Sequence, residues 1–195
     1  PAPPLTKWVS LYRKNRVRHA PIFCSQTLFE QSADMPHNSV MFTRAIVCLP
    51  APNFADGLTS VDLGAPDYAR ALEQHAAYCD ALAACGLQLT SLPADACFPD
   101  STFVEDAAVL TTHGAILTRP GAPSRSGEVE AIRRALAVYY PHPATIEPPG
   151  TLDGGDICEA GSHFLIGISA RTNAEGAAQF SRWLAQGGFT CDCID

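Results

Sequence analysis

A strand pair followed by a helix occurs twice in this sequence, about fifty residues apart. Residues 103–118, FVEDAAVLTTHGAILT, and residues 156–169, DICEAGSHFLIGIS, each have the pattern of two strands joined by a short polar turn. An offset of fifty relates three pairs of like residues: Asp106 and Asp156, His113 and His163, and Ile116 and Ile166. A repeat of this length predicts a radial or stacked array of units, not one doubly wound sheet.

The predicted unit is strand–strand–helix–strand, complete twice and present in part over residues 41–92. The apolar pattern predicts strands at 42–48, 87–92, 104–111, 115–118, 144–147, 156–159, 163–168 and 189–193, and helices at 66–85, 127–139 and 172–186. An array of such units buries all its strand edges only when it closes on itself. We therefore expect these three units to be part of a larger array, cut at its C-terminal side.

Composition narrows the class of protein. The chain has 195 residues, 47% of them hydrophobic, and a net charge of −7, which favours a folded protein with cationic or neutral partners over nucleic acid or an anionic membrane. No apolar stretch has the length of a membrane span or of a signal-peptide core. Eight cysteines contain no CxxC pair, and Cys48, Cys79 and Cys158 lie in apolar patterns. We expect free thiols, no metal, no cofactor and a cytoplasmic protein.

Residues 1–40 differ from the rest of the chain. They carry five basic and two acidic residues, so their net charge is +3. Because the whole chain has a net charge of −7, residues 41–195 have a net charge of −10. They also show prolines and no clear periodicity. We expect a basic leader outside the fold, disordered or extraneous, and a domain over residues 41–195. A native basic arm is the alternative.

Five carboxylates stand at the mouths of the two predicted hairpins: Asp100, Glu105, Asp106, Asp153 and Asp156. Because equivalent loops of a repeat lie at the same end of the array, the two clusters are expected to converge. Like charges so close raise one another's pKa unless a cation lies between them, and a guanidinium matches carboxylates in a bidentate fork. The alternative is that these acids cap turns or pair with Arg119 and Arg171.

The loops that follow the hairpins supply the opposite charge. Arg125 lies in Ser124-Arg125-Ser126, and Arg171 lies in the run that ends at Asn173. Two arginines at one pocket would hold a carboxylate, although arginines solvated near helix starts are an equal alternative. A ligand with a guanidinium at one end and a carboxylate at the other resembles arginine.

Several ordered stretches resemble the dimethylarginine dimethylaminohydrolase family of the pentein, or guanidino-group-modifying, superfamily. They are DGLTSVDLGAPDYARALEQHAAY (56–78), FPDSTFVEDAAVL (98–110), LTRPGAPSRSGE (117–128), PPGTLDGGDI (148–157) and IGISARTNAEGA (166–177). The resemblance covers most of residues 41–186, and residues 1–40 match nothing in the family. It implies an α/β propeller of five ββαβ units, of which about three are present here.

The resemblance also implies a role for individual residues. The guanidino group of the substrate would be bound by Asp100, Phe103, Glu105 and Asp106. Leu58 would belong to a loop that closes over the substrate. The substrate's α-carboxylate would be held by Arg125 and Arg171, and Asp153 would orient a catalytic histidine. The expected partner is a small, cationic, arginine-like molecule, and a homodimer is left open.

The family's reaction is attack of a cysteine thiolate on the guanidinium carbon, loss of an amine, and release of citrulline by water with a histidine as acid and base. No cysteine or histidine of this sequence stands at the matching positions, so we expect the chain alone to be inactive and to supply the substrate-binding half. Alternatives are an arginine deiminase, a non-catalytic protein that binds arginine-like ligands, and a truncated product without a stable fold.

Overall fold

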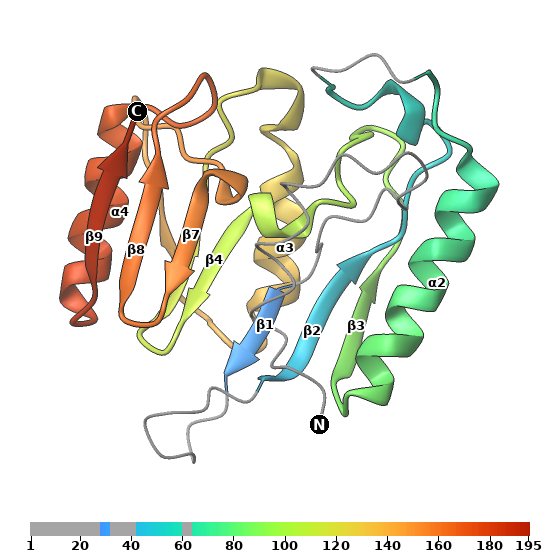
Figure 1. The fold of residues 1–195 in the computed structure, drawn as a ribbon, viewed down its shortest axis with the longest axis horizontal. Helices are drawn as coiled ribbons and strands as arrows, with labels where there is room; N and C mark the ends of the chain where they lie inside the picture. Colours follow the sequence, from blue (N-terminus) through green and yellow to red (C-terminus); the bar gives the residue numbers. More distant parts are fainter. Residues whose placement is uncertain (1–27, 32–41, 60–63) are drawn as a thin grey trace.

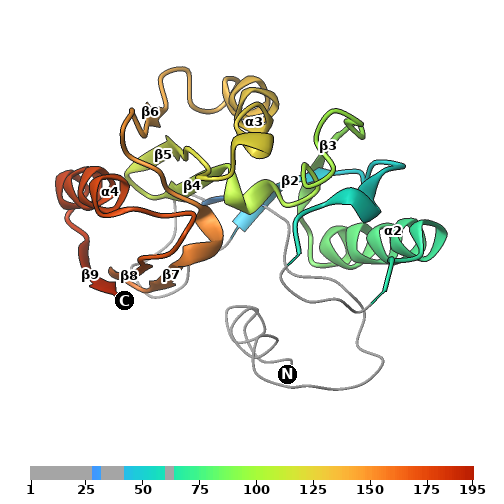
Figure 2. The ribbon, with the colours of Figure 1, turned by 90° about the horizontal axis from the view of Figure 1, so that it is seen from above.

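Three small sheets, each with its own helix, make up the described part of the protein (Figures 1 and 2). The computed structural model describes residues 28–31, 42–59 and 64–195. Within these ranges no helix is long and apolar enough to cross a membrane. Figure 2 shows the three sheets side by side, with α2, α3 and α4 toward the outside of the arrangement. The fold is therefore mixed α/β, as predicted.

All three units have the same chain path. The elements of the first are β1 (Leu28–Gln31), β2 (Phe42–Cys48), α2 (Tyr68–Ala84) and β3 (Gln88–Leu92). Those of the second are β4 (Ala108–Thr111), β5 (Gly114–Leu117), α3 (Glu128–Leu136) and β6 (Ala144–Thr145). Those of the third are β7 (Ile157–Ala160), β8 (His163–Gly167), α4 (Ala174–Gln186) and β9 (Thr190–Ile194). In each sheet the first two strands are antiparallel and the third pairs parallel to the second, after the helix.

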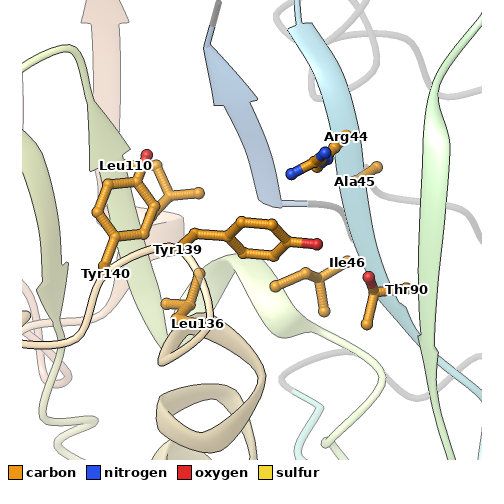
Figure 3. A pocket seen from close by; sticks show the side chains of 8 residues that line it. All are labelled: Arg44, Ala45, Ile46, Thr90, Leu110, Leu136, Tyr139 and Tyr140. Carbon is orange, nitrogen blue, oxygen red and sulfur yellow. The ribbon is translucent and has the colours of Figure 1, made fainter.

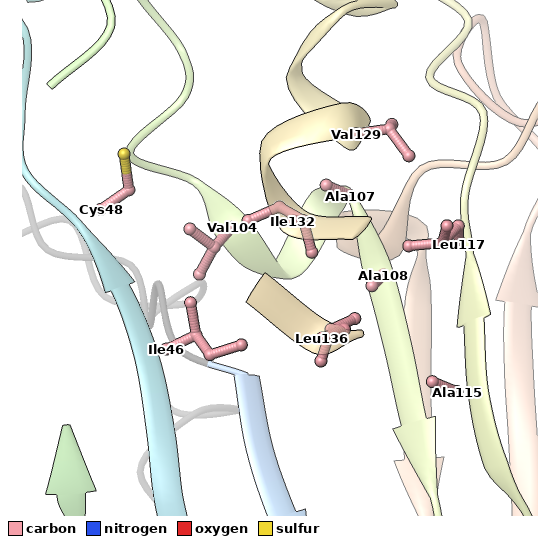
Figure 4. Packing of buried hydrophobic residues seen from close by; sticks show 10 residues of the cluster. All are labelled: Ile46, Cys48, Val104, Ala107, Ala108, Ala115, Leu117, Val129, Ile132 and Leu136. Carbon is pink, nitrogen blue, oxygen red and sulfur yellow. The ribbon is translucent and has the colours of Figure 1, made fainter. Parts of the chain in front are cut away.

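The helices α3 and α4 are each packed between two neighbouring sheets, whereas α2 packs on its own sheet. Ile132 and Leu136 of α3 lie in one cluster with Leu117 of their own sheet and with Ile46 of β2, the first sheet (Figure 4). A second cluster places α4 against its own sheet and against the face of the second sheet that α3 does not cover. Its buried members are Ile116, Ile146, Leu152, Phe164, Ile166, Ala177, Phe180 and Leu184. One helix therefore fills the space between two successive sheets.

Each predicted hairpin is preceded by a short 3₁₀ helix that the sequence analysis did not predict. Residues Val104–Asp106 form the 3₁₀ helix η2, and Gly154–Asp156 form the equivalent η4, so strands begin only at β4 and β7. In a 3₁₀ helix, residues three apart lie on the same side. That spacing puts both Val104 and Ala107 into the core, which the alternation of a strand would not allow.

The repeat offset also changes within the hairpin. It is fifty between η2 and η4, but forty-nine between the first residues of β4 and β7, because Ala107 is an extra residue in the second unit. His113 consequently lies in the turn after β4, whereas His163 is the first residue of β8. The prediction that these two histidines are equivalent was wrong, although the order of elements was correct.

Only four residues of the predicted leader are described. They form β1, whose register pairs Leu28 with Ile46 and Glu30 with Arg44. Most of residues 1–40, including Lys7 and Cys24, lies outside the described residues. That this segment is a leader separate from the domain stays a prediction.

Candidate functional site

The two 3₁₀ helices that carry the carboxylates lie in contact. Their approach is very close at Gly154, where a Cβ atom would come within 1.9 Å of the backbone oxygen of Glu105. Only glycine fits there, because any side chain would force η4 away from η2. The acids of the second and third units therefore converge, as the repeat predicts.

Arg125 occupies the middle of this acidic group. Its side chain is only 6% exposed, and its Nη1 donates to Asp106 Oδ2 at 2.7 Å. Nε and Nη2 form a fork with the Glu128 carboxylate at 2.7–3.2 Å, and Nη2 also reaches the backbone oxygen of Asp100 at 3.3 Å. The Nη1 to Asp153 Oδ2 distance is 3.8 Å. We call Glu105, Asp106, Glu128 and Asp153 the acidic cage.

Glu128 is the member of the cage that sequence reasoning missed. It is the first residue of α3, where an acid is normally an exposed partner of the helix dipole. Here its side chain is 4% exposed and burial raises its pKa, while the bonds from Arg125 act in the opposite direction. The only sequence signal was its place at the end of the stretch SRSGE.

Two carboxylate oxygens of the cage receive no hydrogen bond from the described residues: Glu105 Oε2 and Asp153 Oδ2. Burial, and then the negative charge of Asp106, raise the pKa of Glu105 well above its usual range. The same two causes raise the pKa of Asp153 to about 7. Arg125 inside the cage and Arg171, whose charge lowers the pKa of Asp153, are fewer than the four carboxylates, and this charge balance favours protonation or a further cation.

Arg171 forms the corresponding pair in the third unit. Its Nη2 makes a very short contact with Asp156 Oδ1, and its Nε lies 3.9 Å from Asp153 Oδ2. Asp156 Oδ2 also accepts from Ser169 Oγ at 2.7 Å and from Thr172 Oγ1 at 2.9 Å. The Arg171 side chain is 43% exposed, in contrast to Arg125.

Asp100 is held by the loop that carries Leu58. Both of its carboxylate oxygens lie 3.1 Å from the Leu58 backbone nitrogen, and Asp100 is 6% exposed. A Cβ on Gly57 would come within 2.5 Å of Asp100 Oδ1, so the loop backbone lies directly against the carboxylate. Leu58 itself is 61% exposed, and residues 60–63 that follow lie outside the described ranges. Phe103 is half-buried, with its ring centroid 6.5 Å from that of Phe54.

The alternative pairing of the acids holds for Arg171, which pairs with Asp156, but not for Arg119. Arg119 Nη1 donates to the backbone oxygen of Gly150 at 3.1 Å. Among the contacts described, none joins a cysteine or histidine to the site carboxylates. Cys48, a buried thiol at the end of β2, contacts Ser101 and backbone oxygens, and burial raises its pKa, which disfavours the thiolate.

A separate small groove lies between the first and second units, near the C-terminal end of α3 (Figure 3). Arg44 stacks over the ring of Tyr139 there, with its guanidinium carbon 4.9 Å from the ring centroid. The groove is lined by strand residues, by Leu136 of α3 and by two tyrosines, and it contains none of the predicted site residues. It does not contribute to the acidic cage.

Known proteins resemble this chain closely. The chain is 52% identical over 151 residues to the N(G),N(G)-dimethylarginine dimethylaminohydrolase of Pseudomonas aeruginosa, a match that covers 77% of this chain and 59% of that protein. The protein of the same name from Streptomyces coelicolor is 44% identical over 138 residues, which are 70% of this chain and 53% of that protein. The chain thus spans a little over half the length of these curated relatives. No protein-family model matches the sequence.

Comparison with solved structures gives the same result. A mutant dimethylarginine dimethylaminohydrolase from Pseudomonas aeruginosa, in complex with citrulline, superposes with a TM-score of 0.77 at 51% sequence identity. That match covers 79% of this chain and 61% of the other. Sequence and fold together make this chain a homologue of the dimethylarginine dimethylaminohydrolases.

Proposed function

We propose that the protein hydrolyses N-omega-methylated arginine to citrulline and an alkylamine, and that this chain supplies the part that binds the guanidinium. The single observation that carries the proposal is the excess negative charge of the acidic cage. Glu105 Oε2 and Asp153 Oδ2 are buried acceptors without a donor, and both carboxyl groups have raised pKa values. A cation that donates two N–H groups would satisfy both oxygens and keep both acids ionised.

The relatives support the choice of ligand. The Pseudomonas aeruginosa and Streptomyces coelicolor homologues are dimethylarginine dimethylaminohydrolases, and one relative is known in complex with citrulline, the product of the proposed reaction. Citrulline retains the amino-acid end of arginine. In our proposal the guanidinium lies against Glu105 and Asp153, with Asp100, Phe103 and Asp106 completing the wall, and Leu58 lies in the loop that covers it.

The reaction itself needs a thiolate nucleophile and a proton donor for the departing amine. The family resemblance assigns these roles to a cysteine and a histidine, with Asp153 orienting the histidine. The buried thiol of the first unit, Cys48, has a pKa that burial raises, which disfavours the thiolate. We therefore propose that this 195-residue chain binds the ligand but releases no citrulline.

We also propose that the three units belong to an α/β propeller of five. Cytoplasmic location, a homodimer and the lack of a cofactor stay predictions.

Calorimetric titration of the 195-residue chain with dimethylarginine and with citrulline tests the binding claim. We expect saturable binding that Glu105→Gln and Asp153→Asn weaken by tenfold or more, because a charge-assisted bond contributes about 1.5–3 kcal/mol. Glu130→Gln is the matched control, since Glu130 is an exposed acid on α3 that pairs with Arg133 and Arg134. Equal binding of norleucine, which has no guanidinium, would contradict the proposal.

A colorimetric assay for citrulline tests the second claim. We expect no product from dimethylarginine or from arginine above a blank without protein. Turnover that survives dialysis and is lost on Cys191→Ser or Cys193→Ser would show that a thiol of this chain is the nucleophile.

A further inference from the structure

Two buried acids of the acidic cage, Asp106 and Asp153, lie next to each other but have very different hydrogen-bond partners. Asp106 ends η2, and its Oδ2 accepts from Arg125 Nη1 at 2.7 Å. Asp153 directly precedes η4 and is 1% exposed, and its Oδ1 accepts from the Gly155 backbone nitrogen at 2.9 Å. Its other oxygen, Oδ2, receives no hydrogen bond from the described residues. Only one of the two acids therefore has an arginine as a direct donor.

The arginines of the site do not supply the missing donor to Asp153. Arg125 Nη1 lies 3.8 Å from Asp153 Oδ2 and Arg171 Nε lies 3.9 Å from it, so both are beyond hydrogen-bond length. In the described part of the chain, the remaining charged groups that act on the pair and on these arginines are acids of η2, η4, α3 and the loop before η2: Glu105, Asp156, Glu128 and Asp100. They add negative charge and no donor.

A proton on Asp153 satisfies this oxygen. As two carboxylates, Asp106 and Asp153 are acceptors that repel each other, whereas a protonated Asp153 becomes a donor to the Asp106 carboxylate. Burial, then the negative charge of Asp106 and a hydrogen bond to its side chain, raise the pKa of Asp153 to about 7, against the opposing charge of Arg171. Asp153 takes the proton because Asp106 already accepts from Arg125.

We propose that Asp153 carries a proton in the absence of ligand, donates it in a hydrogen bond to Asp106, and loses it to solvent when a cationic ligand enters the acidic cage. The exchange is balanced: one carboxyl O–H bond breaks, the proton goes to the buffer, and the guanidinium becomes the donor to the ionised carboxylates. A neutral ureido ligand such as citrulline brings no charge to replace the proton, so it binds with the proton in place. The cage therefore discriminates a cation from a neutral ligand of similar shape in a way that depends on pH.

The part of this proposal that concerns the ligand rests on the proposed function. The protonation of Asp153 without ligand is a property of the folded chain, and carbon-13 NMR of the 195-residue chain with labelled aspartate carboxyl carbons tests it. At pH 6 we expect one signal of a protonated carboxyl, since exposed aspartates are ionised by then. Asp153→Asn should remove this signal. Asp106→Asn should shift it to the ionised position, because the repelling charge is gone.

Calorimetric titration in two buffers of different ionisation enthalpy counts the protons that binding releases. At pH 6, dimethylarginine should release about one proton more from the unaltered chain than from Asp153→Asn, and citrulline should release none. The difference between the two chains removes any contribution of Glu105, whose pKa burial also raises. Glu130→Gln is the matched control, since Glu130 is an exposed acid of α3, and it should release as many protons as the unaltered chain.

The affinity for the two ligands should depend on pH in different ways. Between pH 5 and pH 6 the Kd of dimethylarginine should fall at least about tenfold, because a proton must leave Asp153 for each cation bound, and the change should level off above pH 7. The Kd of citrulline should stay constant over this range. In Asp153→Asn the change for dimethylarginine should be about tenfold smaller.

The outcomes separate this proposal from the proposed function. Proton release that Asp153→Asn does not reduce, or the same pH dependence for both ligands, overturns the exchange, and a chain whose aspartates are all ionised at pH 6 overturns the protonation. If circular dichroism shows that Asp153→Asn is unfolded, the unaltered chain decides: one aspartate carboxyl that titrates near pH 7 supports the proposal, and its absence overturns it. If the chain binds neither ligand, the proposed function and the exchange both fail, and the carboxyl titration still decides whether Asp153 is protonated.

Discussion

The acid–arginine pair of the second unit is buried, whereas in the third unit the arginine of the pair is nearly half exposed. Asp106 and Arg125 have side chains that are 12% and 6% exposed, against 9% and 43% for Asp156 and Arg171. Both pairs arise at the same two places in the repeat, so local chain path does not explain the difference. Two differences bear on it: Glu128 stands where the third unit has Ala174, and the third unit lies against the second-unit pair, with Asp153 3.8 Å from Arg125, whereas no further unit lies against Arg171 among the described residues. The comparison teaches that burial of such a pair depends on the neighbouring unit as well as on its own residues.

The largest expected effect is the loss of stability when the arginine of a pair is replaced, and this loss should be larger in the second unit than in the third. Arg125→Met leaves the buried carboxylates of Asp106 and Glu128 without their cation, and should lower the free energy of unfolding by about 3–5 kcal/mol. Arg171→Met should lower it by about 1 kcal/mol or less, since the pair is half-exposed and Asp156 keeps its two hydroxyl donors. Urea unfolding measures both. Equal losses would break the comparison.

The pH dependence of stability should show the excess charge of the cage. Asp153 has a folded-state pKa of about 7 and an ordinary value of 3.8, so between these pH values the folded state binds a proton that the unfolded state has lost. The contribution of Asp153 to stability therefore falls as pH rises from about 4 to about 7. Each pKa unit is worth about 1.36 kcal/mol, so the effect is at most a few kcal/mol.

Asp153→Asn, which cannot ionise, isolates this effect. The stability difference between the variant and the unaltered chain, measured by urea unfolding at pH 5 and at pH 7, should shift in favour of the variant at pH 7. Asp156→Asn is the control in the third unit, because Asp156 is paired with Arg171. A difference that does not change with pH would show that the folded and unfolded states do not differ in the protonation of this residue between pH 5 and pH 7.

The contact between the two 3₁₀ helices should depend on Gly154. Gly154→Ala would place Cβ 1.9 Å from the Glu105 backbone oxygen, so the helices must separate, at a cost of about 1–3 kcal/mol or more. Gly167→Ala is the matched control, since its Cβ would meet nothing closer than 3.4 Å. The ligand affinity of Gly154→Ala should fall as well, because the carboxylates of the two units move apart. Normal stability of this variant would contradict the close approach.

The smallest expected effect concerns how the two helices begin. Asn173 caps α4 by accepting from the Gly176 backbone nitrogen at 2.8 Å, and Asn173→Ala should cost about 1 kcal/mol in urea unfolding. At the equivalent place before α3, Gly127→Asn should not stabilise the chain, because a Cβ there would lie 2.2 Å from Phe98 Cζ. A gain in stability from Gly127→Asn would show that the Phe98 ring moves aside freely.

The sequence predicted the order of elements because each strand and helix has its own apolar period. It also predicted that the acids of two units meet, since equivalent loops of a repeat lie together. It did not predict the 3₁₀ helices, because Val104, Glu105 and Asp106 directly precede the apolar run of β4, and only their packing on the neighbouring unit favours a three-residue spacing.

The environment of Arg125 could not be predicted for a different reason. An acid at the start of a helix is normally explained by the helix dipole, so the position of Glu128 did not indicate a buried partner for Arg125. Whether such an acid is solvated or buried depends on what covers it. Here Phe98 lies over the adjacent Gly127, a contact between residues far apart in the sequence.

The placement of α3 between two sheets bears on how the protein unfolds. Because α3 covers both the first and the second sheet, a local opening of that helix exposes two sheets to solvent at once. Neighbouring units are then energetically coupled, as in a one-dimensional array with strong nearest-neighbour terms. Amide hydrogens of β2, β4 and β5 should therefore exchange in one cooperative step, and excision of a single unit should not yield a fragment with the stability it has in the array.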